Sequence, residues 1–144
     1  MSPNSQTPEP LSRDLVERVM RDQSWHYTID SDGDVGGIWD DNLFYFFIRG
    51  DSDEILYVRG RWHHSLSTDQ RTEAREVLDE WHMQHFWPKG YTRVDDNGDV
   101  RVYGEHVVDW EAGVTFDQLL QTIRCSISTV LGMFEELEQH FGKN

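Results

Sequence analysis

The stretch LFYFFIRGDSDEILYVRGRW at residues 43–62 decides how this chain folds. It contains two runs, 43–49 and 55–62, that are rich in aromatic and β-branched residues, and the turn-forming residues GDSDE separate them. Such runs, bounded by Gly and Asp, are typical of antiparallel strands joined by a hairpin. We therefore expect the fold to be built around a sheet that contains both runs.

The first run is apolar at every position from Leu43 to Ile48. A sheet with one dry face and one wet face requires only alternate apolar residues. We therefore expect that something covers part of the second face of this sheet.

More strands are predicted on both sides of this stretch. Residues 26–30 and 35–39 precede it and complete a meander of three or four strands, and two further strands flank an Asn97-Gly98 turn. A two-residue loop there would pair Val94 with Arg101. A five-residue loop over 95–99 pairs Val94 with Val100 and keeps the apolar face continuous, so we expect the longer loop.

Three helices are predicted around the sheet. Residues 11–20 have apolar positions at helical spacing, and Ser67 with Gln70 forms a capping box before a helix over about 68–86. Thr115 with Gln118 forms a second capping box before the last helix. The apolar residues of that helix share one side: Phe116, Leu119, Leu120, Ile123, Ile127, Val130, Leu131, Phe134, Leu137 and Phe141.

These elements predict an α+β fold with one antiparallel sheet of about five strands flanked by three helices. The expected order is helix, three or four strands, helix, two strands, helix. Residues 1–10 contain three prolines and no apolar periodicity, so we expect a disordered tail followed by a single domain over 11–144.

Charge and composition exclude several classes of partner. The chain has 27 Asp and Glu against 13 Lys and Arg, a formal net charge of −14, which repels nucleic-acid phosphates and anionic membranes. No apolar stretch is long enough for a membrane helix, and the start lacks the features of a signal peptide. With Cys125 as the only cysteine, we expect a cytoplasmic protein with neither a disulfide nor a multi-cysteine zinc site.

No motif in the sequence predicts catalysis. There is no GxSxG turn and no Gly-rich phosphate loop followed by Lys. Cys125 lies in the middle of a predicted helix, away from the helix N-terminus that usually activates a thiol, and has no positioned basic partner. We therefore expect no enzymatic activity and no cofactor.

Two kinds of residue suggest metal ions. A calcium-binding loop needs Gly at its sixth position and Glu at its twelfth. The acidic segment 30–34 leads to Val35 and Asp41 at these positions, and 95–99 leads to Val100 and His106, so we interpret both as hairpin turns. His63, His64, His82 and His85 lie close in sequence but lack a zinc motif, and a partly buried, hydrogen-bonded His85 is the favoured interpretation. A metal-responsive or small-molecule sensor remains the alternative function.

The aromatic residues and one side of the last helix suggest a binding surface. The aromatic residues exceed what one sheet face easily hides, although three helices covering all of them is an open alternative. The last helix carries a strip of small or uncharged residues that permits close approach of another subunit, or is only an under-charged surface. The candidate partner-binding residues are Trp39, Phe44, Phe46, Tyr57, Trp62, Cys125, Thr129 and Gly132.

Several segments in this order resemble the YbjN-domain family of bacterial proteins, in its actinobacterial branch, over about residues 12–141. The matching segments are GIWD at 37–40, LYVRGRW at 56–62, WPKGY at 87–91, VD at 108–109 and GVTFDQL at 113–119. One position departs from the family pattern, because His82 follows Trp81 where the family often has Asn, which puts any function of that Asn in doubt.

The resemblance implies a fold like that of type III secretion chaperones and a protein-binding, chaperone-like or regulatory function, with a homodimer as the expected assembly. It implies no catalytic residues. The identity of a protein partner does not follow from it.

Overall fold

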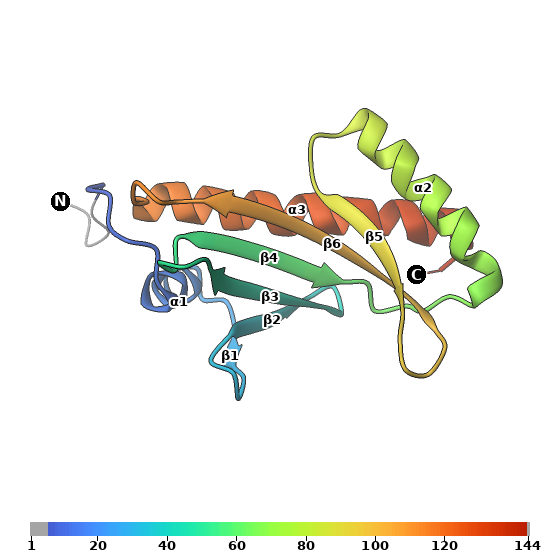
Figure 1. Ribbon diagram of the computed structural model, residues 1–144, viewed down its shortest axis with the longest axis horizontal. Coiled ribbons are helices and arrows are strands. Elements are labelled where there is room, and N and C mark those ends of the chain that lie inside the picture. Colours follow the sequence, from blue (N-terminus) through green and yellow to red (C-terminus); the bar gives the residue numbers. More distant parts are fainter. Residues whose placement is uncertain (1–5, 144) are drawn as a thin grey trace.

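The computed structural model describes residues 6–143. One antiparallel sheet and three long helices make up these residues (Figure 1). The elements are α1 (Arg13–Asp22), β1 (Thr28–Ile29), β2 (Val35–Trp39), β3 (Asn42–Arg49), β4 (Ile55–Arg61), the 3₁₀ helix η1 (Thr68–Gln70), α2 (Arg71–Gln84), β5 (Lys89–Val94), β6 (Val100–Asp109) and α3 (Phe116–Phe141).

The α+β class and the order of elements are confirmed, with six strands where about five were predicted. The sixth is β1, which has only two residues, and strands β1 to β4 form the predicted meander. A two-residue turn joins β2 to β3, and both of its residues, Asp40 and Asp41, have positive φ angles, as a type I′ hairpin requires.

The sheet order β1-β2-β3-β4-β6-β5 places the last strand next to the centre. β6 pairs with β4 on one side and with β5 on the other, so β5 is an edge strand. Val94 pairs with Val100, which confirms the five-residue loop. Apolar continuity across the hairpin was therefore the correct criterion for the register.

The three helices pack on one face of the sheet, which we call the covered face. Along β3 and β4 the fully buried residues Phe44, Phe46, Leu56 and Val58 alternate with residues on the other face. The same core includes most of the apolar stripe of α3, which runs along the length of the sheet (Figure 1). The long core-facing stripe predicted for the last helix is thus confirmed.

A row of three glycines lets α3 lie close to the sheet. Gly60, Gly104 and Gly90 are direct neighbours across β4, β6 and β5. A Cβ atom on Gly60 would lie 2.8 Å from Val130 of α3, and one on Gly90 would lie 2.6 Å from Met133. Any larger residue in this row would push the helix away from the strands.

Both predicted capping boxes are present. The Thr115 side chain accepts from the Gln118 backbone N–H while the Gln118 side chain accepts from the Thr115 N–H, and α3 begins there. The box of Ser67 and Gln70 opens the short helix η1, and α2 follows directly.

The predicted tail over 1–10 needs a correction at its inner end. Residues 1–5 lie outside the described residues, but Glu9 pairs with Val114 through two backbone hydrogen bonds of 3.1 and 2.8 Å. The Glu9 carboxylate also forms an ion pair with Arg18 of α1. The ordered part of the chain therefore starts before Leu11. The backbone bridge between Glu9 and Val114 holds this segment in place, although the segment has no apolar periodicity.

Candidate functional site

The second face of the sheet, which we call the open face, has no helix of residues 6–143 packed on it. Strand register places on it the residues that alternate with the core. They are Thr28, Gly36, Ile38, Leu43, Tyr45, Phe47, Arg49, Ile55, Tyr57, Arg59, Arg61, Lys89, Tyr91, Arg93, Arg101, Tyr103, Glu105, Val107 and Asp109.

Aromatic rings and arginines alternate across the open face. Tyr45 and Phe47 stack with ring centroids 5.3 Å apart, and Tyr57 meets Phe47 edge-on at 5.4 Å. The Arg59 guanidinium lies over two rings, 5.0 Å from the centroid of Phe47 and 5.3 Å from that of Tyr103. These contacts hold the aromatic rings and the cations in fixed positions.

The expected cover over the apolar run 43–48 comes from these side chains themselves. Phe47 is 9% exposed although it lies on the open face, because Arg49 and Arg59 both lie over its ring. Arg49 also pairs with Asp34 at 3.4 Å, which fixes its position. A partner that displaced the water from this layer would bind side chains that are already ordered, so little conformational entropy would be lost on binding.

Glu105 is the buried centre of the open face. It is 8% exposed, forms an ion pair with Lys89 at 2.8 Å, and accepts hydrogen bonds from the hydroxyls of Tyr57 and Tyr91. Burial on its own raises the pKa of this carboxyl, but the bonds from Lys89 and the two tyrosines outweigh it and lower the pKa below its ordinary value. Burial and Glu105 together raise the pKa of Tyr57.

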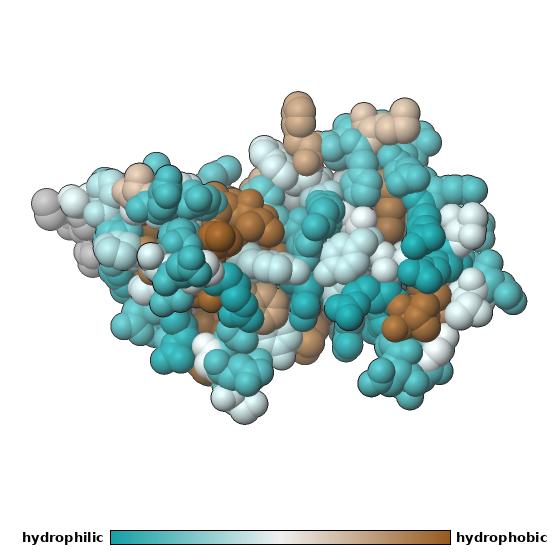
Figure 2. Space-filling model, viewed as in Figure 1, coloured by the Kyte–Doolittle hydropathy of each residue, from teal (hydrophilic) through white to brown (hydrophobic). Residues whose placement is uncertain are grey.

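The open face is basic although the chain is acidic. Nearly half of the 13 Lys and Arg lie on it, and they are Arg49, Arg59, Arg61, Lys89, Arg93 and Arg101. Because β5 and β6 pass in front of α3 in Figure 1, the same view in Figure 2 looks onto this side, where hydrophilic, intermediate and hydrophobic side chains are interleaved. The remaining surface carries most of the negative charge.

Three of the predicted partner-binding residues belong to the core instead. Phe44, Phe46 and Trp62 are at most 1% exposed and lie on the covered face, so a partner does not reach them. Trp39 also faces that side and packs edge-on against Phe44 and Phe46. The physical reason is that alternation along a strand separates two faces but does not tell which of them the helices cover.

Only Tyr57 among the predicted aromatic residues lies on the open face. The strip on α3 is half-exposed at Cys125 and Thr129, and the Thr129 hydroxyl donates to the Cys125 carbonyl oxygen. A contact within this chain explains why position 132 is Gly, because a Cβ there would lie 3.2 Å from the ring of Trp81. The close approach inferred for another subunit is therefore made, at Gly132, by α2 of the same chain.

The acidic segments form turns, as predicted. The Asp30 carboxylate accepts from the backbone N–H groups of Asp32 and Asp34, and Asp95 accepts in the same way from Asn97 and Asp99. These bonds explain why Asp occupies the first position of each turn.

His82 of α2 and His85, which directly follows the helix, both make contacts at the C-terminal end of α2. His82 Nε2 accepts from the Gly90 N–H at 2.9 Å, which connects α2 to β5. His85 is exposed, contrary to the predicted partial burial, and stacks on Trp81 with ring centroids 3.5 Å apart. Its hydrogen bond to the Trp81 carbonyl oxygen agrees with the hydrogen-bonded histidine that we favoured.

Two features of the surface were missed from the sequence. Glu105 has no nearby motif, because its partners come from β4 and β5 and meet only in the sheet. Exposed apolar residues lie at the end of α2, at Met83, and in the loop that leads to β5, at Phe86 and Trp87; Phe86 is 94% exposed. Helical periodicity assigned this segment to the end of a helix and therefore did not indicate its exposure.

The fold and the open face define a class: an α+β domain with one six-stranded antiparallel sheet, one face of which is covered by the helices found in residues 6–143. Residues 12–139 match the family model YbjN, described as "Putative bacterial sensory transduction regulator". The chain belongs to the YbjN family, as its sequence motifs predicted.

Two solved structures share this fold. The crystal structure of YbjN from E. coli, described as "a putative transcription regulator", superimposes with a TM-score of 0.79 at 11% sequence identity, covering 93% of this chain and 96% of that chain. The crystal structure of an uncharacterized protein from Methanothermobacter thermautotrophicus has a TM-score of 0.61 at 12% identity, covering 91% of this chain and 99% of that chain. None of the curated proteins matches the chain.

Within residues 6–143 no helix combines the length and the apolar character that crossing a bilayer requires.

Proposed function

We propose that this chain is a non-catalytic protein-binding module of regulatory type, and that the open face of its sheet is the binding surface. The observation that carries the proposal is the ordered layer of aromatic and arginine side chains on a face that no helix of residues 6–143 covers. Tyr and Arg are enriched in the residues that contribute most binding energy at protein interfaces. The family description as a regulator is consistent with such a function.

The chemistry of the open face selects an acidic partner with apolar side chains. Arg59 and Arg61 lie on β4, and Arg93 lies opposite Arg101 on the neighbouring strands β5 and β6. Two arginines in direct opposition repel each other until a carboxylate lies between them. Face-to-face pairing of two copies would bring these arginines together, so this surface favours a different protein over self-association.

Nucleic acid is the weaker alternative for the same surface. Aromatic and basic side chains on a sheet can stack on bases, but the whole chain has a formal charge of −14, and the acidic groups outside the open face repel a phosphate backbone. Binding of RNA or DNA by the open face, at physiological salt, would overturn the proposal.

Site-specific photocrosslinking in the native host tests the proposal. A photoreactive phenylalanine analogue at Tyr45 lies on the open face, and the same analogue at Gln121, an exposed position on α3, is the matched control. We expect one set of proteins to crosslink through position 45 and not through 121. Crosslinks from position 45 should also be lost when Arg59 is replaced by Glu, and crosslinks that survive this change would contradict the assigned surface.

The homodimer implied by the family resemblance stays a prediction. Light scattering of the purified chain measures it directly. Because Gly132 already contacts Trp81 within the chain, replacing Gly132 by Glu disturbs the packing of α2 on α3 in a monomer as well and is not a specific test of association.

A further inference from the structure

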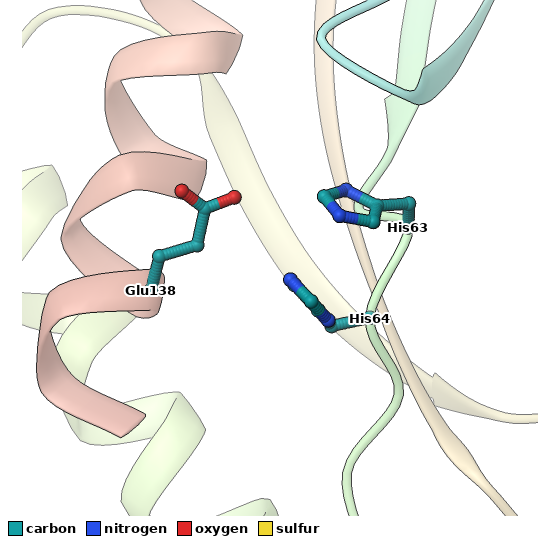
Figure 3. Close-up of side chains that lie close together, drawn as sticks. All are labelled: His63, His64 and Glu138. Atoms are coloured by element: carbon teal, nitrogen blue, oxygen red, sulfur yellow. The ribbon is translucent and has the colours of Figure 1, made fainter. Parts of the chain in front are cut away.

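Three side chains with metal-binding atoms meet at one end of the molecule, away from the open face. His63 and His64 directly follow β4, and Glu138 lies near the C-terminal end of α3. One ligand atom from each residue lies within 4.8 Å of the other two, and all three side chains are half-buried. Figure 3 shows the carboxylate and both imidazole rings directed into the same space.

Asn42 fixes which nitrogen of His63 carries the hydrogen. The Asn42 amide nitrogen donates to the carbonyl oxygens of Trp39 and Asp40, so its amide oxygen faces His63. That oxygen accepts from the His63 backbone N–H at 2.8 Å and lies 2.9 Å from Nδ1. Because an amide oxygen only accepts, Nδ1 carries the hydrogen and Nε2 keeps the lone pair that binds a metal.

Asn42 is itself held rigidly. It is 1% exposed and follows the type I′ turn at Asp40 and Asp41, whose carbonyl geometry positions the amide. Metal-binding histidines usually donate their second nitrogen to such an oxygen, which orients the ring and raises its basicity.

Glu138 is positioned by the core. The buried Trp62 indole N–H donates to Glu138 Oε1 at 3.3 Å, and the Trp62 ring also contacts the ring of His64 edge-on at 5.1 Å. One buried residue therefore touches two of the three candidate ligands. Trp62, which we first assigned to a partner surface, instead lies beneath this cluster.

We infer that His63, His64 and Glu138 form a binding site for a divalent transition-metal ion, with Zn²⁺ as the best fit. Two imidazole nitrogens and one carboxylate oxygen are a known three-ligand set for zinc, with the fourth position left to water. Nitrogen donors disfavour Mg²⁺ and Ca²⁺, which prefer oxygen.

The observed spacing is compatible with this site after a small closure. Ligand atoms about 2.1 Å from a tetrahedral zinc ion lie roughly 3.4 Å apart. The ligand atoms of His63, His64 and Glu138 lie within 4.8 Å of one another, so each pair needs to approach by at most about 1.4 Å when the ion binds. Rotation of the exposed part of each side chain supplies that movement, while Asn42 and Trp62 keep the inner contacts.

The ion would connect α3 to the segment between β4 and α2. Because the ion would bind only when these segments are folded together, its binding raises the free energy of unfolding of the native chain. The site is independent of the proposed protein-binding surface, because its ligands lie on the covered side of the sheet.

Metal-dependent thermal stability tests the inference. The full chain, freed of metal with a chelator and dialysed, is melted with and without ZnCl₂ or MgCl₂, and zinc affinity is measured by titration calorimetry. We expect Zn²⁺ at a hundredfold excess over its Kd to raise Tm by roughly 5–10 °C, and Mg²⁺ to leave Tm unchanged. Co²⁺ should give the strong visible absorption of a four-coordinate ion.

Variants locate the ion. Glu138→Gln keeps an acceptor for Trp62 but removes the charged ligand, and it should weaken zinc binding at least tenfold; His63→Asn with His64→Asn should abolish the Tm rise. His26→Asn removes an exposed histidine elsewhere and is the matched control. Circular dichroism of the metal-free variants verifies their folding.

Three results would overturn the inference: no Tm rise with Zn²⁺, an equal rise with Mg²⁺, or a rise that persists in the His63 and His64 double variant.

Discussion

The two faces of the sheet are built from neighbouring residues of the same strands, yet they differ in what holds them together. On the covered face, Phe46 and Val58 are buried by helices and contribute to the core. On the open face, Tyr45 and Tyr57 both pack against Phe47, and Arg49 and Arg59 lie over the Phe47 ring. Successive residues of one strand can therefore serve stability and binding separately.

The difference matters for any attempt to separate folding from function. Removing a covered side chain leaves a cavity beneath a helix, whereas removing an open one only exposes a neighbour to water. Variants of the open face should thus change binding while the fold persists.

The largest expected difference in stability is between variants of two adjacent residues, Phe46 and Tyr45, which lie on opposite faces. Replacing Phe46 by Ala should lower the free energy of unfolding by about 3–5 kcal/mol, because the ring is fully buried in the core. Replacing Tyr45 by Ala should cost about 1 kcal/mol or less. Urea unfolding measures both, and equal losses would contradict the assignment of the two faces.

The glycine row gives the second comparison. Gly60→Ala places a methyl group 2.8 Å from Phe44 and Val130 and should cost about 1–3 kcal/mol. Gly36→Ala is the open-face control, since its nearest neighbour is the movable ring of Tyr45 at 3.0 Å, and it should cost less. Combining Gly60→Ala with Val130→Ala should destabilise less than the sum of the single changes.

A third test concerns Glu105 and pH. Its pKa in the folded chain lies below its ordinary value of 4.5, so the ionised form stabilises the fold above that pH and the contribution is lost as the pH falls through the lowered pKa. Glu105→Gln should destabilise by about 1–3 kcal/mol at pH 7. Unfolding curves from pH 7 to pH 3 should show this difference shrinking, and a constant difference would contradict it.

The smallest effect on stability is expected for Arg59. Replacing it by Gln removes two cation–π contacts on a solvated surface and should cost about 0.5–1 kcal/mol, measured by thermal unfolding. The same change should sharply reduce crosslinking to a partner from position 45. A large loss of stability would mean that the open face belongs to the folding core.

The sequence predicted what depends on local patterns. The capping boxes of Ser67 and Thr115, the stripe of α3 and the pairing of Val94 with Val100 all follow from residues close together in the chain. The family could be predicted for a similar reason, because its sequence pattern consists of short segments in a fixed order along the chain.

What remained hidden depends on tertiary contacts. Phe44 and Trp62 are of residue types that are common at binding surfaces. Only the placement of the helices shows that they belong to the core. Glu105 meets Lys89, Tyr57 and Tyr91 across three strands, and His63 meets Glu138 across 75 residues of sequence, so no local window contains either group.

The pairing of β4 with β6 has a consequence for the order of folding. The meander of β1 to β4 can form early, but the remaining edge of β4 waits for a strand that follows α2 and β5 in the chain. Its covered face waits longer still, for α3. During synthesis the edge of β4 stays unpaired until β6 is made, and apolar rings of the covered face stay exposed until α3 is made, so truncation before Phe116 should yield aggregates.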